Sequence, residues 1–255
     1  MNTAISAEWR KLCTVRSTRY ILGSPLVALA VGGLVAVLMT ADWDGSTAAE
    51  RTTFPGADPA ILAVPFTQFC LAALGALVMT SEYATGMIRT SLAAVPRRRR
   101  LIAAKAAVVA SVAFVSGQTI AVASFALGGL ITGDRPAPIA AWESVPEGLA
   151  AAFGNGLSIM VIGVVGLGFG AVLRSTAGAF VAVGAVLFVL PTVARMVFPS
   201  WGEDIASLLP AGLAPQFAGT ADDPVLPPVL ALAVMLGYAA FALIAAVFAL
   251  TRRDA

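Results

Sequence analysis

The sequence predicts an all-α integral membrane protein with six transmembrane helices and both termini in the cytoplasm. Three observations lead to this prediction. The chain has 255 residues, of which 59% are hydrophobic and 12% are charged, whereas soluble domains carry about 25% charged residues. Its mean hydropathy is +0.90. Six apolar runs are separated by short polar segments, and most lysines and arginines fall in alternate segments. We expect a single transmembrane domain over 1–255.

Each apolar run is long enough to cross a bilayer, since a spanning helix needs about 20 residues. Five runs contain no Asp, Glu, Lys or Arg, and the fifth in order carries Arg195 near its end. The predicted spans are about 20–41, 59–81, 106–133, 148–173, 175–198 and 224–251.

Orientation follows from the lysine and arginine count. With the N-terminus inside, 13 of the 16 basic residues lie on the inner side and 11 of the 14 acids lie outside. Basic residues are retained on the cytoplasmic side during insertion. The sequence therefore predicts that both termini face the cytoplasm.

Residues 1–19 are expected to form an amphipathic helix on the inner membrane surface. Ile5, Trp9 and Leu12 have helical spacing, and arginines are available for the polar side. Two roles remain open for this helix: an anchor on anionic lipid, which we favour, and a lever that touches a cytoplasmic partner.

At the outer side, 41–58 and 134–147 have the composition of exposed loops. The segment 199–223 differs, because helical spacing of its apolar residues is interrupted by Pro210 and Pro215. We expect one or two short interfacial or re-entrant helices there.

Glycine and polar residues within the spans favour helix packing. Gly166 and Gly170 form a G-x-x-x-G pattern, which allows close approach of two helices. Intramembrane polar side chains are more often bonds between helices than substrate contacts. If a translocation path exists, its first candidates are Gln68, Gln118, Asn155 and Ser158.

The segment 82–105 follows the second span and holds six of the sixteen basic residues. A short helix over 82–95 would carry Ile88, Leu92 and Val95 on one narrow apolar stripe, which is suited to insertion into a partner's groove. For the four consecutive arginines 97–100 we favour a simpler role: they fix the topology and bind anionic headgroups.

Composition excludes several classes of function. Histidine is absent, and neither Cys13 nor Cys70 has a plausible partner, so no catalytic residues and no metal site are expected. No charged group appears deep in a span to carry a coupling ion. Neither lysine belongs to a phosphate-binding G-x-x-x-x-G-K-[ST] loop. Any ATP chemistry must therefore come from another polypeptide.

The sequence resembles the permease subunits of type-2 ATP-binding-cassette (ABC) transporters, especially bacterial drug and antibiotic exporters. The resemblance rests on SAEWRKLCTVRSTR, SEYATGMIRTSLAAVPRRRRLIAAK, LLPAGLAPQF and TRRDA. It implies that 1–19 is a connecting helix and that 82–105 is a cytoplasmic coupling loop that seats in the ATPase. The expected coupling residues are Glu82, Tyr83, Gly86, Met87, Arg89, Pro96, Arg97 and Arg98.

The resemblance also implies partners. They are a cytoplasmic ABC ATPase that binds ATP and Mg²⁺, and a second permease copy or paralogue. We expect ATP-driven export of a small hydrophobic or amphipathic compound across the cell membrane, with no cofactor in this chain and no nucleic-acid partner. Alternatives are a non-transporting scaffold or regulatory subunit, import by an analogous complex, and ion-linked efflux.

Overall fold

A computed structural model describes residues 2–95 and 97–252, and the regular structure among these residues is helical, with no strand. Pro96, one of the expected coupling residues, lies outside the described residues. The helices are α1 (Asn2–Thr14), α2 (Arg16–Gly45), α3 (Ala48–Arg51), α4 (Ala60–Ala84), α5 (Met87–Ala94), α6 (Arg98–Thr132), α7 (Val145–Leu173), α8 (Thr176–Gly184), the π-helical segment η1 (Ala185–Val189), α9 (Leu190–Val197), α10 (Gly202–Leu208), α11 (Leu213–Ala218) and α12 (Pro228–Arg252).

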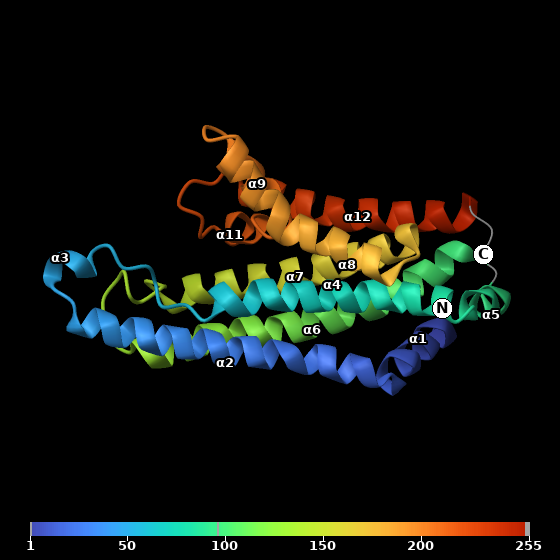
Figure 1. Ribbon diagram of the computed structural model, residues 1–255, viewed down its shortest axis with the longest axis horizontal. Helices are drawn as coiled ribbons and strands as arrows, with labels where there is room; N and C mark the ends of the chain where they lie inside the picture. Colours follow the sequence, from blue (N-terminus) through green and yellow to red (C-terminus); the bar gives the residue numbers. More distant parts are fainter. Residues whose placement is uncertain (1, 96, 253–255) are drawn as a thin grey trace.

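Six helical segments are long and apolar enough to cross a membrane: α2, α4, α6, α7, the continuous run Thr176–Val197, and α12. The predicted all-α, six-helix fold class is therefore confirmed, and the chain has the character of a multi-pass membrane protein. The long helices run side by side, with α1, α5 and the end of α12 at one end of the bundle and α3 at the other (Figure 1). We call the first the basic end, because Arg97–Arg100 also lie there.

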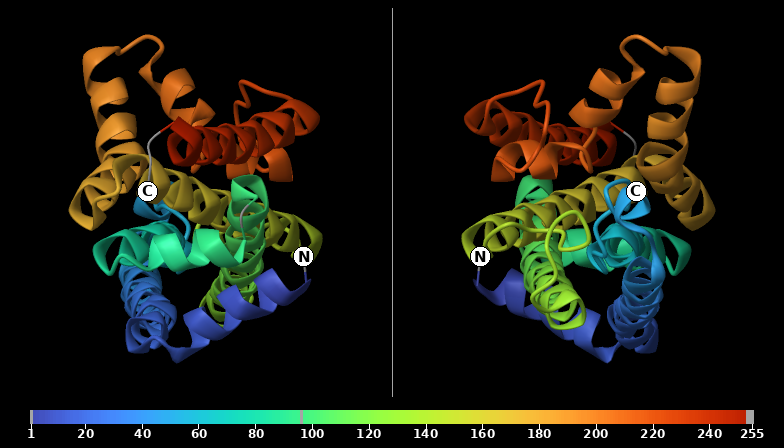
Figure 2. Two further views of the ribbon diagram at one scale, coloured as in Figure 1. Left: turned by 90° about the vertical axis from the view of Figure 1, so that its right-hand side faces the viewer. Right: turned by 90° about the vertical axis from the view of Figure 1, so that its left-hand side faces the viewer.

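The core of the bundle is formed by α4 and α7. Of their most apolar windows, 61% and 72% of residues are buried, against 22% in α2, Thr176–Val197 and α12. The end-on views in Figure 2 show the remaining helices arranged around this pair. The outer helices consequently present apolar faces outward, as a helix does when its solvent is lipid.

Close packing of α4 on α7 depends on small residues. An added Cβ at Gly166 would overlap the carbonyl of Ala72, and one at Gly170 would lie 2.6 Å from the Ala76 oxygen. The close approach expected at these two glycines is thus present, and a larger side chain at either position would push the helices apart.

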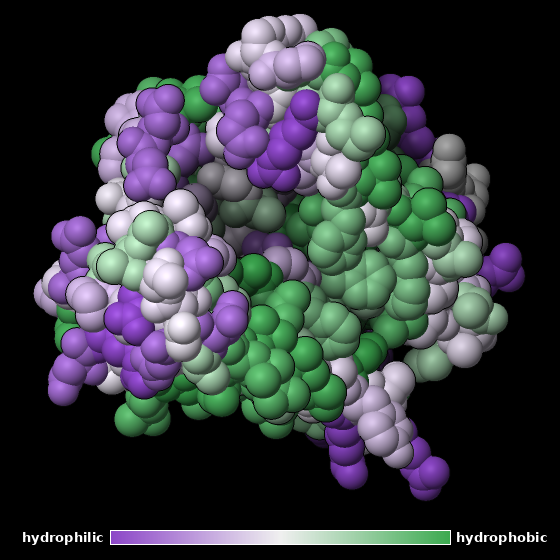
Figure 3. All heavy atoms as spheres, turned by 60° about the vertical axis from the view of Figure 1, so that its left-hand side comes forward, coloured by the Kyte–Doolittle hydropathy of each residue, from purple (hydrophilic) through white to green (hydrophobic). Residues whose placement is uncertain are grey.

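The surface agrees with a membrane-spanning bundle. On the face shown in Figure 3, apolar side chains cover the centre and the right, and hydrophilic ones gather mainly at the left and the top. At the end opposite the basic end, Arg135 forms an ion pair with Asp44, and their Nη2 and Oδ2 atoms are 2.7 Å apart.

Several helix bounds differ from the sequence prediction, mostly at the basic end. The first helix stops at Thr14, since Val15 has an extended backbone, and α2 starts at Arg16 rather than near 20. The third span starts at Arg98 rather than 106. Arginine and lysine are good helix formers, so a change from apolar to basic residues does not end a helix.

The fifth span and the segment after it are the most irregular part. A π-helical segment, η1, interrupts the span just before Pro191, and π segments often accompany a local change in helix geometry. The expected short helices within 199–223 are present as α10 and α11.

Candidate functional site

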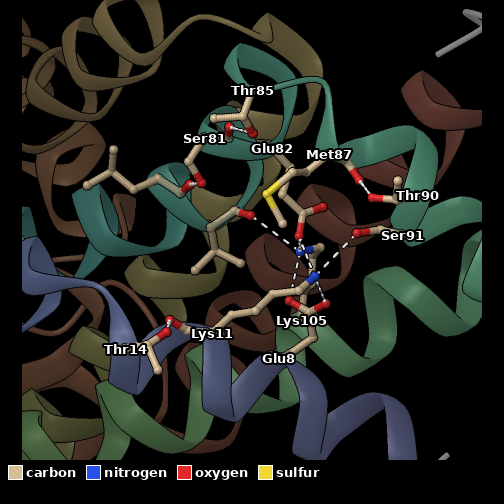
Figure 4. A network of polar contacts seen from close by, with 12 residues as sticks. Glu8, Lys11, Thr14, Ser81, Glu82, Thr85, Met87, Thr90, Ser91 and Lys105 are labelled. Carbon is tan, nitrogen blue, oxygen red and sulfur yellow. Dashed lines mark hydrogen bonds and ion pairs between the residues drawn. The ribbon is translucent and has the colours of Figure 1, made fainter.

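Four ionisable side chains meet at the basic end of the bundle (Figure 4). Glu8 and Lys11 come from α1, Glu82 comes from the last turn of α4, and Lys105 comes from α6. We call these residues the quartet. They join one surface helix to two membrane-spanning helices.

The quartet is closed by four ion pairs. Lys105 Nζ lies 2.8 Å from Glu8 Oε2 and 2.7 Å from Glu82 Oε1. Lys11 Nζ lies 2.8 Å from Glu8 Oε1 and 2.7 Å from the same Glu82 oxygen. Each carboxylate therefore receives both ammonium groups, and the net charge of the quartet is zero.

Burial makes the quartet energetically demanding. Lys105 is completely buried, while Glu8 and Glu82 are 6% and 5% exposed. The effective penalty for burying a single ion is several kcal/mol, and only good pairing compensates for it. Lys11 is the half-exposed member, with 36% of its side chain open to solvent. Removing one buried member consequently leaves its partners uncompensated.

The ionisation of Lys11 reflects both effects. Burial lowers the pKa of its ammonium group, but the hydrogen bonds and charges of Glu8 and Glu82 outweigh burial, so the net pKa is raised above 10.5. Lys11 therefore remains positively charged at physiological pH.

The sequence did not reveal this cluster. We expected no charged group inside a span and placed Lys105 in a solvated loop, but the structure places it in the helical interior of α6, completely buried. The Glu8–Lys11 spacing of three residues was a local signal for an ion pair. Nothing local indicates that Lys105, 97 residues after Glu8, faces the same point.

The short helix α5, between α4 and α6, is bonded to the quartet. Its Ser91 hydroxyl accepts a hydrogen bond from Lys11 Nζ at 3.2 Å. The chain turns into α5 at Gly86, whose φ of 72° is left-handed and favours glycine. This arrangement fixes α5 against α1 and the end of α4.

The apolar stripe of α5 does not face outward as expected. Ile88 is buried in a cluster with Met79, Leu101 and residues of α12, and Leu92 and Val95 pack against that cluster. The stripe is satisfied by the molecule's own core, so the expectation that it enters a partner's groove is wrong. The opposite side of α5 is exposed and includes Arg89 and Thr90, whereas Met87, which is also exposed, lies towards Glu82.

The other expected coupling residues are divided between exposed and structural positions. Arg97 is exposed. Arg98 donates from Nη1 to the Leu250 carbonyl near the end of α12. The ring of Tyr83 lies under the guanidinium of Arg174, 4.9 Å from its centroid. Arg98 and Tyr83 thus connect α6, α4, α7 and α12 at the basic end.

The translocation-path candidates divide in the same way. The amide Nε2 of Gln68 donates to the Ser158 hydroxyl at 2.9 Å, and that hydroxyl donates to the Pro210 carbonyl at 2.9 Å. Both side chains are buried, as expected for bonds between helices. Gln118 is half-buried and donates to the Phe153 carbonyl, and Asn155 is half-buried on α7.

Comparison of the chain with known protein families and with curated proteins finds no match.

Proposed function

We propose that this chain is the membrane-spanning subunit of an ABC exporter in the cell membrane. It would work as a dimer with a second copy or a paralogue, and a separate cytoplasmic ATPase would bind ATP and Mg²⁺ and hydrolyse the nucleotide. The cargo in this proposal is a small hydrophobic or amphipathic compound. The chain itself would contribute no catalytic residue.

One observation carries the proposal: α5 is exposed on one side and fixed to the quartet on the other. Its exposed side offers Arg89 and Thr90 to a partner. Its buried side is bonded through Ser91 to Lys11, and through Lys11 to α1 and α4.

This connection is suited to passing a movement of α5 on to the membrane-spanning helices. A force on α5 is opposed by the packing of Ile88 and by the charge-assisted bonds of the quartet. The bundle's basic end therefore responds as one unit, so that α1, α4 and α6 move with α5. A subunit driven by an external ATPase needs such a unit where the ATPase docks.

The proposal is tested by changing the exposed side of α5 alone. We would purify the tagged full chain from its native membranes in mild detergent, then identify the co-purifying proteins and measure ATP hydrolysis. In the double variant Arg89→Glu/Thr90→Glu, we expect an ATPase that accompanies the wild type to be lost, because both side chains are exposed and Thr90 donates to the Met87 carbonyl of its own helix. Arg16→Glu, an exposed charge reversal at the same end, should retain it.

Two results would contradict the proposal. One is a wild-type chain that purifies without any ATPase from cells that produce such proteins. The other is an ATPase retained equally by the double variant and by Arg16→Glu. Arg98 is a poorer choice for this test because its bond to Leu250 also holds α12.

The quartet supports ion-linked efflux as a second candidate. The sequence had argued against a proton carrier because no buried charge was apparent, and Glu8, Glu82 and Lys105 now supply buried ionisable groups. Vesicles containing the chain distinguish the two functions. Export driven by a proton gradient without ATPase favours ion-linked efflux, whereas a requirement for the ATPase and ATP favours the ABC exporter.

A further inference from the structure

A cavity of about 350 Å³ adjoins the quartet at the basic end. It lies between α1, the first turn of α2, the basic-end half of α4, and α6. Its size falls within the range of small-molecule sites, which is about 300–1,000 Å³.

The wall of this cavity is mostly apolar. Leu12, Leu74, Leu77, Val78 and Val108 supply hydrocarbon from three helices. Three of the hydroxyls that line it donate within the chain: Thr14 to Lys11, Ser81 to Leu77, and Thr85 to Ser81. The body of an occupant must therefore be apolar.

The quartet is the polar side of the cavity, and its donors are fully used. Lys11 Nζ donates to Glu8, Glu82 and Ser91. Lys105 Nζ donates to Glu8, Glu82 and, at 3.4 Å, the Val78 carbonyl. An ammonium group has three hydrogens, so neither lysine has one left for an anionic ligand.

One acceptor of the quartet remains open. Both lysines bond to Oε1 of Glu82, and among the described residues nothing donates to Glu82 Oε2, although this oxygen is buried. A buried acceptor without a donor costs about 1–3 kcal/mol. Met87, which lines the same cavity, is drawn beside Glu82 in Figure 4. Its flexible side chain can move to admit a donor.

Charge decides what kind of donor fits. The quartet already contains two positive and two negative groups, so a charged head would bring an uncompensated ion into a site whose wall is mostly apolar. We propose that this cavity binds an uncharged amphipathic molecule, with an apolar body against α4 and a hydroxyl or amide N–H that donates to Glu82 Oε2. Binding does not require the proposed ATPase and is tested without it.

The test uses native mass spectrometry on the purified full chain, titrated with four probes that share a ten-carbon body. These are 1-decanol, its methyl ether, decylammonium and decanoate. We expect decanol to bind about tenfold more tightly than the methyl ether, which lacks a donor, because a buried hydrogen bond contributes about that factor. The two charged probes should bind more weakly than decanol.

Two tryptophan variants locate the binding. Leu77→Trp fills the cavity without changing the quartet, and we expect it to abolish decanol binding. Leu62→Trp lies on the same helix but outside the cavity, and it should bind as the wild type does. Retained helix content by circular dichroism shows that each variant is folded.

The source of a natural occupant is read from the same spectra. If the chain carries the mass of a neutral lipid before any probe is added, and Leu77→Trp does not, the occupant comes from the membrane. If the chain gains mass only when decanol is added, the natural occupant is a free compound. The proposal is overturned by equal affinities for decanol and its methyl ether, by preferred binding of a charged probe, or by unchanged binding in folded Leu77→Trp.

Discussion

Lys105 and Lys11 bind the same two carboxylates at nearly equal distances, yet their surroundings differ. Lys105 is completely buried in α6, whereas Lys11 is 36% exposed at the surface of α1. A charge in a buried pair depends on its partners, because water cannot replace them. At the residue scale, the contribution of each ion pair to stability is therefore determined by the burial of the lysine and not by the distance between the charged atoms.

Substituting the two lysines separately tests this distinction. We expect Lys105→Met to destabilise the chain by about 3–5 kcal/mol, since it leaves a buried carboxylate under-compensated. Lys11→Met should cost less than Lys105→Met, because the position of Lys11 is 36% exposed and water can partly replace its ammonium group. Denaturant unfolding in detergent, followed by circular dichroism, measures both. Equal losses would mean that burial does not separate the two lysines.

At the element scale, the pair α4 and α7 determines how the bundle packs. Backbone atoms of α4 lie against Gly166 and Gly170 of α7, and polar contact is added by Gln68 and Ser158. Lipid supplies little hydrophobic force between two apolar helices, so close backbone contact is a main source of their association.

A single methyl group at this contact should be costly. We predict that Gly166→Ala lowers stability by about 1–3 kcal/mol, the usual cost of overpacking, because the added carbon overlaps the Ala72 carbonyl. Gly237→Ala is the matched control, since no atom lies within 4 Å of its added carbon in α12. Thermal unfolding in one detergent compares them. A Gly166→Ala chain as stable as the Gly237→Ala chain would refute the close contact.

At the scale of the whole molecule, the basic end and the end that holds α3 should lie on opposite sides of the membrane. Both ends of the described chain are at the basic end (Figure 1). The distribution of lysine and arginine predicts that this end faces the cytoplasm.

Thiol labelling measures this orientation. Cys13 is exposed at the basic end, and Cys70 is buried. In intact cells, a membrane-impermeant maleimide should leave the wild type unlabelled, and it should label Cys13→Ser/Ala48→Cys, whose new thiol lies on exposed α3. Lysed cells provide the control for Cys13 reactivity. Labelling of wild-type Cys13 in intact cells would reverse the assignment.

The sequence was sufficient for features that depend on local composition. Hydropathy predicted the six long helices, and Pro210 marks the break between α10 and α11. Pro215 does not interrupt a helix as expected, since it lies in the first turn of α11, where a proline is tolerated. The long helices follow from the lipid around each apolar segment, and the break follows from the backbone of proline. Neither feature depends on a residue far away in the sequence.

The candidate site depended on distant contacts and was only partly predicted. Periodicity identified the apolar side of α5 but did not show what packs against it. In the structure that side packs into the chain's own core around Ile88. Likewise, composition showed Glu8, Glu82 and Lys105 without showing that they meet. These residues meet because α6 already begins at Arg98. Lys105 therefore belongs to the helix and is buried, and it does not lie in a loop.

The quartet also constrains how this protein can evolve. Loss of one buried charge is damaging while its three partners remain, whereas replacing a whole buried ion cluster by well-packed apolar residues is often neutral or stabilising. Substitutions at 8, 82 and 105 are therefore strongly epistatic, and position 11 is less so because Lys11 is half-exposed. We expect descendants of this chain to keep the ionic set together or to exchange it together, with few surviving intermediates.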